Sequence, residues 1–311
     1  MTTAMYVIVY AGALMFVAGC VRRVLQYARA PLHLRWELYP LPHEEAQRAE
    51  HGGSYFEELD WWEKPRHFNL AGELRAMLPE MLFLKGLREF NRKLWSISFP
   101  FHFGLYLMIG SATVLGASAL VSIGHPAWLA GWTGLAGHVF YKYAGLAGAV
   151  LTVLGSVGLL IRRLTDEDLK NYTVPADLFN LLCFSLTPGL LVVGYFTSGS
   201  RFPGMLALTR GLLTFRPVSS VPPLLAVGVV LLAALTAYIP YTHMAHFIAK
   251  YFTYHSVRWD DALKQPGGKL ERKMAEYLTY RPTWSAPHIG ADGEKTWAEI
   301  AAAAPGREKT R

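Results

Sequence analysis

The sequence has few cysteines and few charged residues, and each shortage argues against a class of function. The two cysteines among 311 residues are Cys20 and Cys183, and each lies in an apolar run. They cannot supply a disulfide framework, a CxxCH haem attachment or the thiolates of an iron–sulfur cluster, so any such centre must belong to a partner protein. Charged residues make up 17% of the chain, below the roughly 25% of ordinary soluble domains. This composition argues against a soluble enzyme.

Apolar residues make up 52% of the sequence and are concentrated in long runs. An apolar helix needs about 20 residues to cross a bilayer, and five runs come close to or exceed that length. The predicted spans are Ala4–Val21, Phe99–Ile123, His138–Ile161, Ala176–Thr197 and Pro223 to about Phe252. The sequence therefore predicts an all-α integral membrane protein with five transmembrane helices, in contact with membrane lipid.

The first apolar run contains a short motif that is typical of removable lipoprotein signals. Val17-Ala18-Gly19-Cys20 resembles a lipoprotein cleavage box, which would make the run a removable signal. A signal peptide needs positive charge before its apolar core, whereas here the leader MTTA is uncharged and the arginines follow the run. We expect this run to be retained as a helix.

The basic residues are distributed unevenly between the two ends of the spans. Most lysines and arginines that flank the spans lie on one side, while the other side has Arg201, Arg210 and Arg216. The positive-inside rule then places the N-terminus outside and the C-terminus in the cytoplasm of a bacterial or archaeal cytoplasmic (inner) membrane. The net charge of +7 is thus interpreted as topology, and we expect no nucleic-acid partner.

Four regions follow from this topology. They are a first transmembrane helix (1–28), a cytoplasmic loop (29–96), a four-helix membrane region (97–252) and a cytoplasmic tail (253–311). The loop is rich in aromatic residues, so it either packs over the helices or docks on a partner. Helices are predicted at Tyr55–Trp62, at Leu70–Phe90 with a kink at Pro79, at Gly268–Tyr280 and at Lys295–Ala303.

Four histidines lie in or at the ends of the spans: His102, His138, His243 and His246. A b-type haem needs one imidazole from each of two helices at the same depth. Counting along helices at about 1.5 Å per residue, His102 lies near the cytoplasmic end, as do His243 and His246. His102 can therefore pair with either, whereas His138 at the opposite end cannot. The alternative is that these are interfacial histidines in the headgroup region.

Three segments resemble a known family. FPFHFGLYLMIG around His102, YAGLAGAVLTVLGSVGLLIRRL and YIPYTHMAHFIAKYF around His246 resemble the five-helix cytochrome b (gamma) subunit of respiratory nitrate reductase. Members of that kind bind haem b, oxidise quinol and pass electrons to a cytoplasmic iron–sulfur subunit. The resemblance implies that His102 and His246 are the haem and metal ligands nearest the cytoplasm. His243 ranks second because the family has a non-ligand there.

The sequence departs from the family at the second, outer haem. Ala112 and Gly228 stand where the family has the ligands of that haem, and neither can bind iron, so we expect one haem b. The loop and tail segments PLHLRWELYPLPHE, HGGSYFEELDWWEKPR and WSAPHIGADGEKTWAEI resemble a sub-branch. Its members are membrane cytochrome subunits of sulfite-reduction and heterodisulfide-reductase-like complexes. That resemblance implies a partner of that kind rather than nitrate chemistry.

A quinone site needs a group that can take a proton beside an apolar slot. His138 is the best candidate because histidine changes charge near neutral pH, and Lys142 lies one turn further on. Both could instead anchor the helix at the membrane surface. A quinone at His138 would also lie about 20 Å or more from a haem at His102, so a site closer to His102 remains equally open.

The sequence thus favours a membrane b-type cytochrome subunit of a quinone-linked oxidoreductase complex. It would transfer electrons between the quinone pool and a cytoplasmic iron–sulfur partner, and no residue is assigned a catalytic role of its own. The alternative is a haem-free membrane anchor or scaffold for a soluble redox subunit. A transporter is disfavoured because the spans contain no charged pair and no broken-helix repeat.

Overall fold

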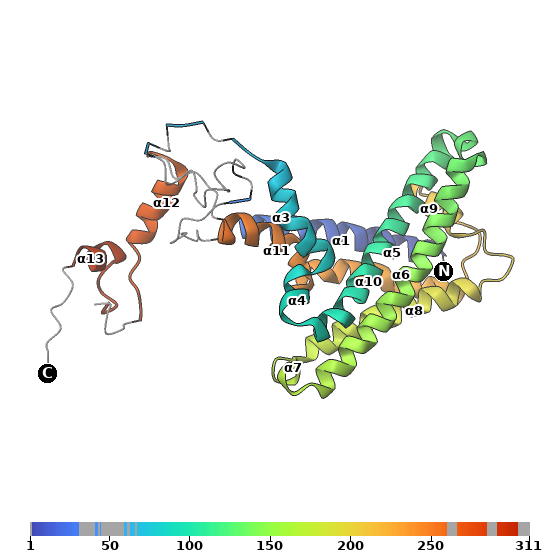
Figure 1. The fold of residues 1–311 in the computed structure, drawn as a ribbon. Helices are drawn as coiled ribbons and strands as arrows, with labels where there is room; N and C mark the ends of the chain where they lie inside the picture. The colour runs from blue at the N-terminus through green and yellow to red at the C-terminus, as the bar shows by residue number, and fades with distance from the viewer. Residues whose placement is uncertain are drawn as a thin grey trace. The chain divides into compact units, whose positions relative to one another are not determined.

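Figure 1 shows the fold in a computed structural model. The structure describes residues 2–30, 41, 42, 44, 59, 60, 63–65, 67–259, 266–284 and 291–303. The chain forms two compact units. One contains residues 1–31 and 70–252, and the other contains residues 32–69 and 253–311. Most of the predicted helix Tyr55–Trp62 lies outside the described residues.

The first unit contains five helices that are long and apolar enough to cross a membrane. They are α1 (Thr2–Ala28), α5 (Arg92–Gly124), α6 (Trp132–Thr165), α8 (Pro175–Phe196) and α10 (Pro223–Tyr238). No strand occurs among the described residues. The prediction of an all-α integral membrane protein with five transmembrane helices is confirmed. Several helices continue beyond the predicted spans because their polar end residues also adopt helical backbone.

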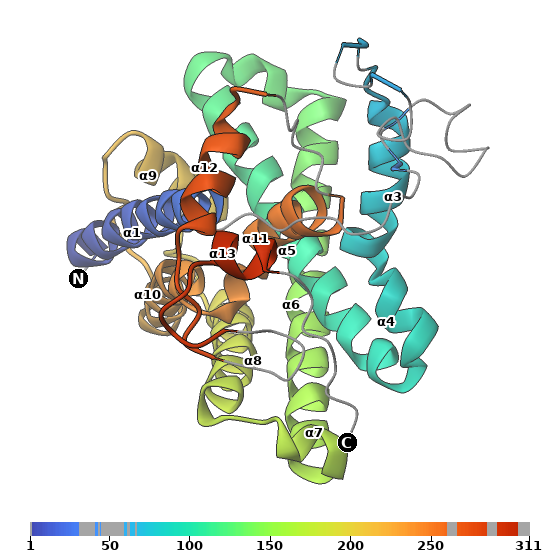
Figure 2. The same ribbon diagram turned by 90° about the vertical axis from the view of Figure 1, so that its left-hand side faces the viewer.

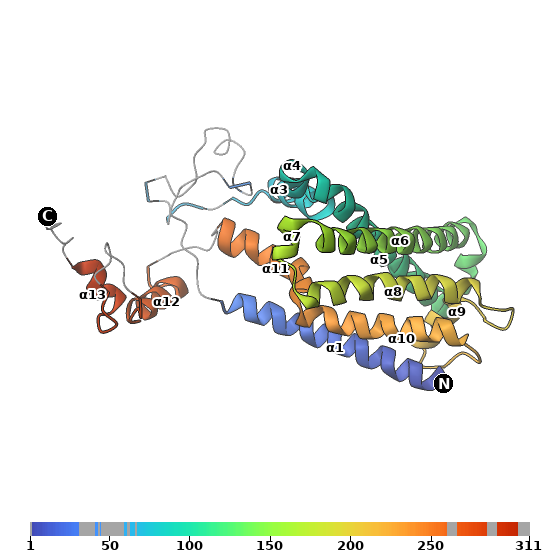
Figure 3. The ribbon, with the colours of Figure 1, turned by 90° about the horizontal axis from the view of Figure 1, so that it is seen from below.

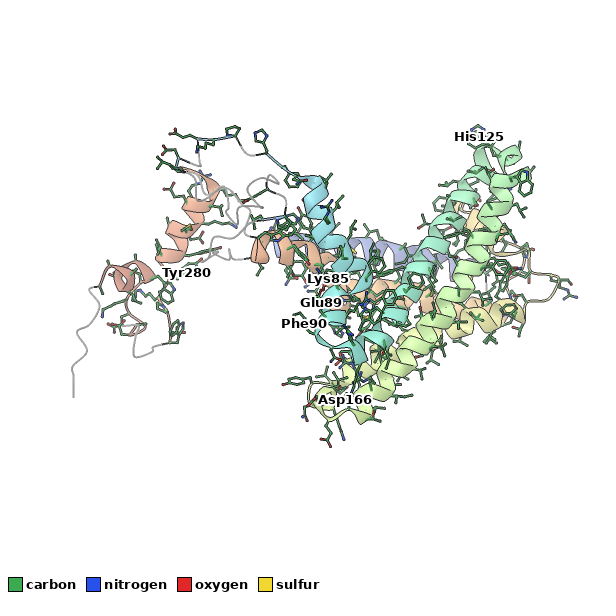
Figure 4. All side chains as sticks on the ribbon, viewed as in Figure 1. Lys85, Glu89, Phe90, His125, Asp166 and Tyr280 are labelled. Atoms are coloured by element: carbon green, nitrogen blue, oxygen red, sulfur yellow. The ribbon has the colours of Figure 1, made fainter. Side chains whose placement is uncertain are left out.

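Helices α1, α8 and α10 run alongside one another in Figure 3, and the α5–α6 hairpin crosses them at a steep angle in Figure 1. One end holds the N-terminus of α1 and the short helix α9 (Met205–Leu213), and the other holds α7 (Glu167–Asn171) and α11 (His246–Phe252). Helices α5 and α6 form a hairpin through the turn η2 (Pro126–Ala130), and His125 and Asp166 mark its two ends in Figure 4. Helix α8 packs on α6, and α10 packs on α8 and α1.

Glycines bring α5 and α6 into close contact. A Cβ atom on Gly104 would lie 2.6 Å from the Thr152 nitrogen and 2.7 Å from the Gly148 carbonyl oxygen. A Cβ on Gly148 would lie 2.7 Å from the Gly104 carbonyl oxygen. In lipid, small residues stabilise helix pairs because they let the two backbones approach. Only glycine fits at these two positions. The close packing of α5 on α6 therefore explains the glycine of the FHFG segment, Gly104.

The fifth apolar run does not form one continuous helix. Helix α10 ends at Tyr238, two 3₁₀ turns follow at Ile239–Tyr241 (η3) and His243–Ala245 (η4), and α11 begins at His246. Thr242 between the turns is extended, with φ −119° and ψ 178°. Proline has no N–H to donate and its ring crowds the preceding turn, so Pro240 favours a break here. The expectation of one helix from Pro223 to about Phe252 is therefore wrong.

The predicted helix Leu70–Phe90 is two helices, α3 (Leu70–Phe83) and α4 (Lys85–Phe90). The break is at Leu84, which has φ 53°, whereas Pro79 lies within α3. The C-terminal end of α3 contacts α5, because Tyr106 Oη donates to the Met81 carbonyl oxygen at 2.7 Å. Trp95 Nε1 donates to the Phe83 carbonyl oxygen at 2.8 Å.

The second unit contains helix α12 (Lys269–Leu278) and helix α13 (Trp297–Ala302). Both lie within the ranges predicted for the tail. The side chain of Thr296 accepts a hydrogen bond from the Glu299 backbone nitrogen and caps α13. The Trp297 backbone nitrogen donates to the Tyr280 carbonyl oxygen at 3.0 Å, so the start of α13 is tied to the segment that follows α12.

Candidate functional site

Two histidines from separate elements lie together at the α7 end of the bundle. The ring centroids of His102, on α5, and His246, at the start of α11, are 6.1 Å apart with an interplanar angle of 67°. His102 Nδ1 lies 2.8 Å from the Ser98 carbonyl oxygen, and His246 Nδ1 lies 3.4 Å from the His243 carbonyl oxygen. A carbonyl can only accept, so both rings carry their proton on Nδ1 and leave Nε2 available as a metal ligand.

The separation of these rings fits two imidazoles on one metal ion. Metal–nitrogen bonds of about 2 Å on opposite sides of an ion place the two ring centroids about 6 Å apart. The 6.1 Å between His102 and His246 agrees with that requirement. A flat porphyrin also needs the helices that lead to its two ligands, α5 for His102 and α10 before the break at His246, to stay apart elsewhere. Helix α5 packs on α6 and α9, and α10 packs on α1 and α8, so α5 and α10 do not pack along each other (Figure 2).

Helix α1 stabilises the break between α10 and α11, which lies directly before His246. Arg23 Nε donates to the Pro240 carbonyl oxygen at 2.7 Å, and Nη2 donates to the Thr242 carbonyl oxygen at 3.4 Å. A Cβ on Gly19, one turn earlier, would lie 2.7 Å from Pro240 Cβ, so glycine is needed there. Backbone carbonyls released by a helix break need new donors when buried. Sequence reasoning treated Arg23 as a topology determinant and missed this role.

Replacing Arg23 by alanine is expected to lower the free energy of unfolding by about 1–3 kcal/mol. The reason is that two partly buried carbonyls lose their charged donor. The measurement is denaturation of the purified protein in detergent. Arg22→Ala is the matched control because Arg22 is the exposed neighbour on the same helix. Equal stability of the two variants would show that the helix break does not need the hydrogen bonds from Arg23.

His243 is turned away from the pair. Its Nε2 lies 3.4 Å from Asp177 Oδ1, while Asp177 Oδ2 accepts a hydrogen bond from Arg163 Nη1 at 3.0 Å. Asp177 also accepts from the Val174 backbone nitrogen at 3.2 Å, at the start of α8. The structure therefore brings His102 together with His246 and directs His243 toward α8.

Charged side chains are also tied together elsewhere at the α7 end. Lys250 Nζ on α11 lies 3.0 Å from Glu80 Oε1 on α3. Arg162, in the last turn of α6, donates to Asp166, and this hydrogen bond lowers the pKa of the Asp166 carboxyl from its usual value. Among the described residues, no group of three or more metal-ligating side chains occurs, so the histidine pair is the candidate for a group held by two protein ligands.

His138 lies at the other end of the bundle, in a pocket of about 570 Å³ that is comparable to small-molecule sites. The pocket is lined by the end of α5, the turn η2, the start of α6 and α9, including Ser118, Trp132 and Leu206. His138 Nδ1 and Tyr141 Oη are 2.7 Å apart. Lys142 is exposed, with Nζ 5.7 Å from the Tyr143 ring centroid, and does not line the pocket.

The pocket and the histidine pair are far apart along α6. Gly155 of α6 packs against Phe101, the neighbour of His102, so it marks the level of the pair. The helical rise from His138 to Gly155 gives a separation of roughly 25 Å. The structure therefore places His138 and His102 far apart, as the sequence predicts.

The family comparison covers both sites. A model of the nitrate reductase gamma subunit matches residues 89–260, which is more than half of the chain and includes α5 through α11. A comparison with curated proteins found no match. The matched part contains His102, His138 and His246, and Ala112 and Gly228 as well. The chain therefore belongs to the nitrate reductase gamma subunit family, whose members are membrane cytochrome b subunits of quinone-linked oxidoreductases.

Proposed function

We propose that this chain binds one haem b between His102 and His246 and transfers electrons between the quinone pool and a cytoplasmic iron–sulfur partner. The observation that carries the proposal is the 6.1 Å separation of two imidazole rings from different elements. Both rings are oriented by backbone carbonyls through Nδ1, as in other metal-ligating histidines. The narrower resemblance to subunits of sulfite-reduction and heterodisulfide-reductase-like complexes stays a prediction.

The chain's residues would hold and orient the group. Bound haem supplies reversible one-electron transfer. His102 is fixed within α5 by the Ser98 carbonyl, and His246 is fixed by the His243 carbonyl at the helix break that Arg23 supports. The close α5–α6 contact at Gly104 sets the position of the turn that carries His102. Ala112 and Gly228 supply no ligands for a second haem, which supports a stoichiometry of one.

The partner is expected to dock at the α7 end. The pair lies there, and the basic residues concentrated at this end predict that it faces the cytoplasm. The chain cannot hold an iron–sulfur cluster itself, because its two cysteines lie on different helices, Cys20 on α1 and Cys183 on α8. The next electron carrier must therefore sit on another subunit.

The experiment that tests this function is a pyridine haemochrome assay on the purified protein. One haem b per chain is the expected result. A protein without haem would contradict the proposal and would support the haem-free anchor, since an anchor needs no iron.

The pocket at His138 supports a quinone site at the opposite end. His138 and Tyr141 form a hydrogen-bonded pair at its wall, and histidine can take the proton that quinol releases. His138→Phe is expected to slow quinol-driven haem reduction in membranes by at least about 100-fold. Lys142→Met is the control, because Lys142 lies outside the pocket, and its rate should be unchanged. An unchanged rate in His138→Phe would move the quinone to another site, such as one beside His102.

A further inference from the structure

Asn180 is a buried polar side chain with no hydrogen-bond partner among the described residues. It lies within α8 and is only 4% exposed. In the part of the chain that the structure describes, neither its Nδ2 nor its Oδ1 makes a hydrogen bond. Buried amides are almost always paired, because an unpaired donor or acceptor keeps its full desolvation cost. Asparagine also has a low helix propensity, so helix formation does not explain the residue. Its partner is therefore to be sought outside the protein chain.

The neighbours of Asn180 on α8 lead to both histidines of the pair. Residues three and four positions apart share a helix face. Asp177, three residues before Asn180, contacts His243 Nε2 at 3.4 Å, and the carbonyl of His243 orients His246. Phe184, four residues after Asn180, packs on Phe101 with ring centroids 5.3 Å apart, and Phe101 packs on His102 at 5.2 Å. Asn180 thus lies on the face of α8 that contacts Phe101 and His243, the residues next to the pair.

The chemistry of the group expected there indicates what Asn180 contacts. Haem b carries two carboxylates, which need hydrogen-bond donors when they are removed from water. Two basic side chains at this end already hold acids, since Arg163 is 3.0 Å from Asp177 and Lys250 is 3.0 Å from Glu80. A neutral amide facing the site can donate without adding a buried charge.

We propose that Asn180 is a binding residue for the haem and that its side-chain N–H donates a hydrogen bond to a haem carboxylate. This inference rests on the proposed haem at His102 and His246. It assigns a third residue, from a helix that supplies no iron ligand, to the retention of the group. Its role is to orient the porphyrin edge, and it does not act on the iron.

The test is the rate at which purified holoprotein in detergent loses haem to an excess of apomyoglobin. Asn180→Leu removes both polar atoms while keeping the same number of side-chain heavy atoms, and is expected to lose haem on the order of tenfold faster. Asn180→Ala also removes the donor, with a smaller side chain, and should lose haem at least as fast as Asn180→Leu. Thr187→Val is the matched control, because Thr187 is buried on the same helix about two turns further on, and its rate should stay within about twofold of wild type.

The outcomes separate this inference from the proposed function. Wild-type protein without haem would overturn both. Haem-loaded wild type with an unchanged loss rate in Asn180→Leu would overturn only the role of Asn180 and would assign its partner to a water molecule. A wild-type rate in Asn180→Ala would also overturn it, because the position would then need no donor. If Asn180→Leu does not insert, the smaller Asn180→Ala decides the question.

Discussion

Replacing His102 by alanine is expected to remove the b-type haem spectrum from the purified protein. With one of the two imidazoles removed, the chain would hold the iron through a single side chain, and a non-covalent haem would lose most of its attachment. His246→Ala should have the same effect, because the centroids of the two rings lie only 6.1 Å apart. The measurement is the reduced-minus-oxidised absorption difference per mole of chain, and we expect a near-complete loss in both variants.

His243→Ala is the control for this pair of substitutions. His243 lies only three residues before His246, but its Nε2 is directed at Asp177 Oδ1 at 3.4 Å. Its removal should therefore leave the haem content close to that of wild type. Haem retained in His102→Ala, or lost only in His243→Ala, would show that the ligand pair is assigned wrongly.

Replacing Gly148 by leucine is expected to be the most damaging substitution outside the histidine pair. A Cβ at this position would already lie 2.7 Å from the Gly104 carbonyl oxygen, and the backbone of α5 cannot give way as a flexible side chain can. We expect the free energy of unfolding to fall by at least about 3 kcal/mol, at the upper end for overpacked sites. Size-exclusion chromatography and thermal unfolding in detergent measure the loss of folded protein.

Gly116→Leu provides the matched control for this substitution. Gly116 lies on α5, where a Cβ would meet no atom within 4 Å. Because a side chain there would enter open space, the same change should leave the melting temperature nearly unchanged. Equal damage at Gly116 and Gly148 would mean that the apolar volume, and not the α5–α6 contact, is responsible.

The five transmembrane helices could be predicted because the physical signal is local. A run of about 20 apolar residues in lipid must satisfy its own backbone hydrogen bonds, and a helix does this within one segment. The positions at which helices begin and end were less predictable. Leu84 interrupts the predicted helix Leu70–Phe90 although it is not a breaker residue by type, whereas Pro79 is accommodated within α3.

The pairing of His102 with His246 was predicted from depth along continuous helices and from the family resemblance. The structure brings the two rings together, but α11 presents His246 after a break, so the depth argument was incomplete. On a continuous helix, His243 and His246 would share a face, and geometry could not separate them. The extended Thr242 and the 3₁₀ turn that begins at His243 direct the two histidines to different neighbours.

The supporting residues could not be predicted because their partners are distant in the sequence. Arg23 contacts the carbonyl of Pro240, 217 residues away, and nothing in the local pattern around Arg23 indicates that contact. The sequence shows Asn180 only as a polar residue within an apolar run. The structure adds that its side chain is buried and makes no hydrogen bond among the described residues. The proline in the fifth run was the one available signal, because a helix break frees carbonyls for a neighbouring arginine.

The most direct test of the account is low-temperature electron paramagnetic resonance of the oxidised, purified protein. The spectrum reports the spin state and axial ligands of ferric haem, and integration gives its amount per chain. We predict one low-spin haem with two imidazole ligands. A protein without a haem signal, or with only high-spin haem, would contradict the ligation by His102 and His246.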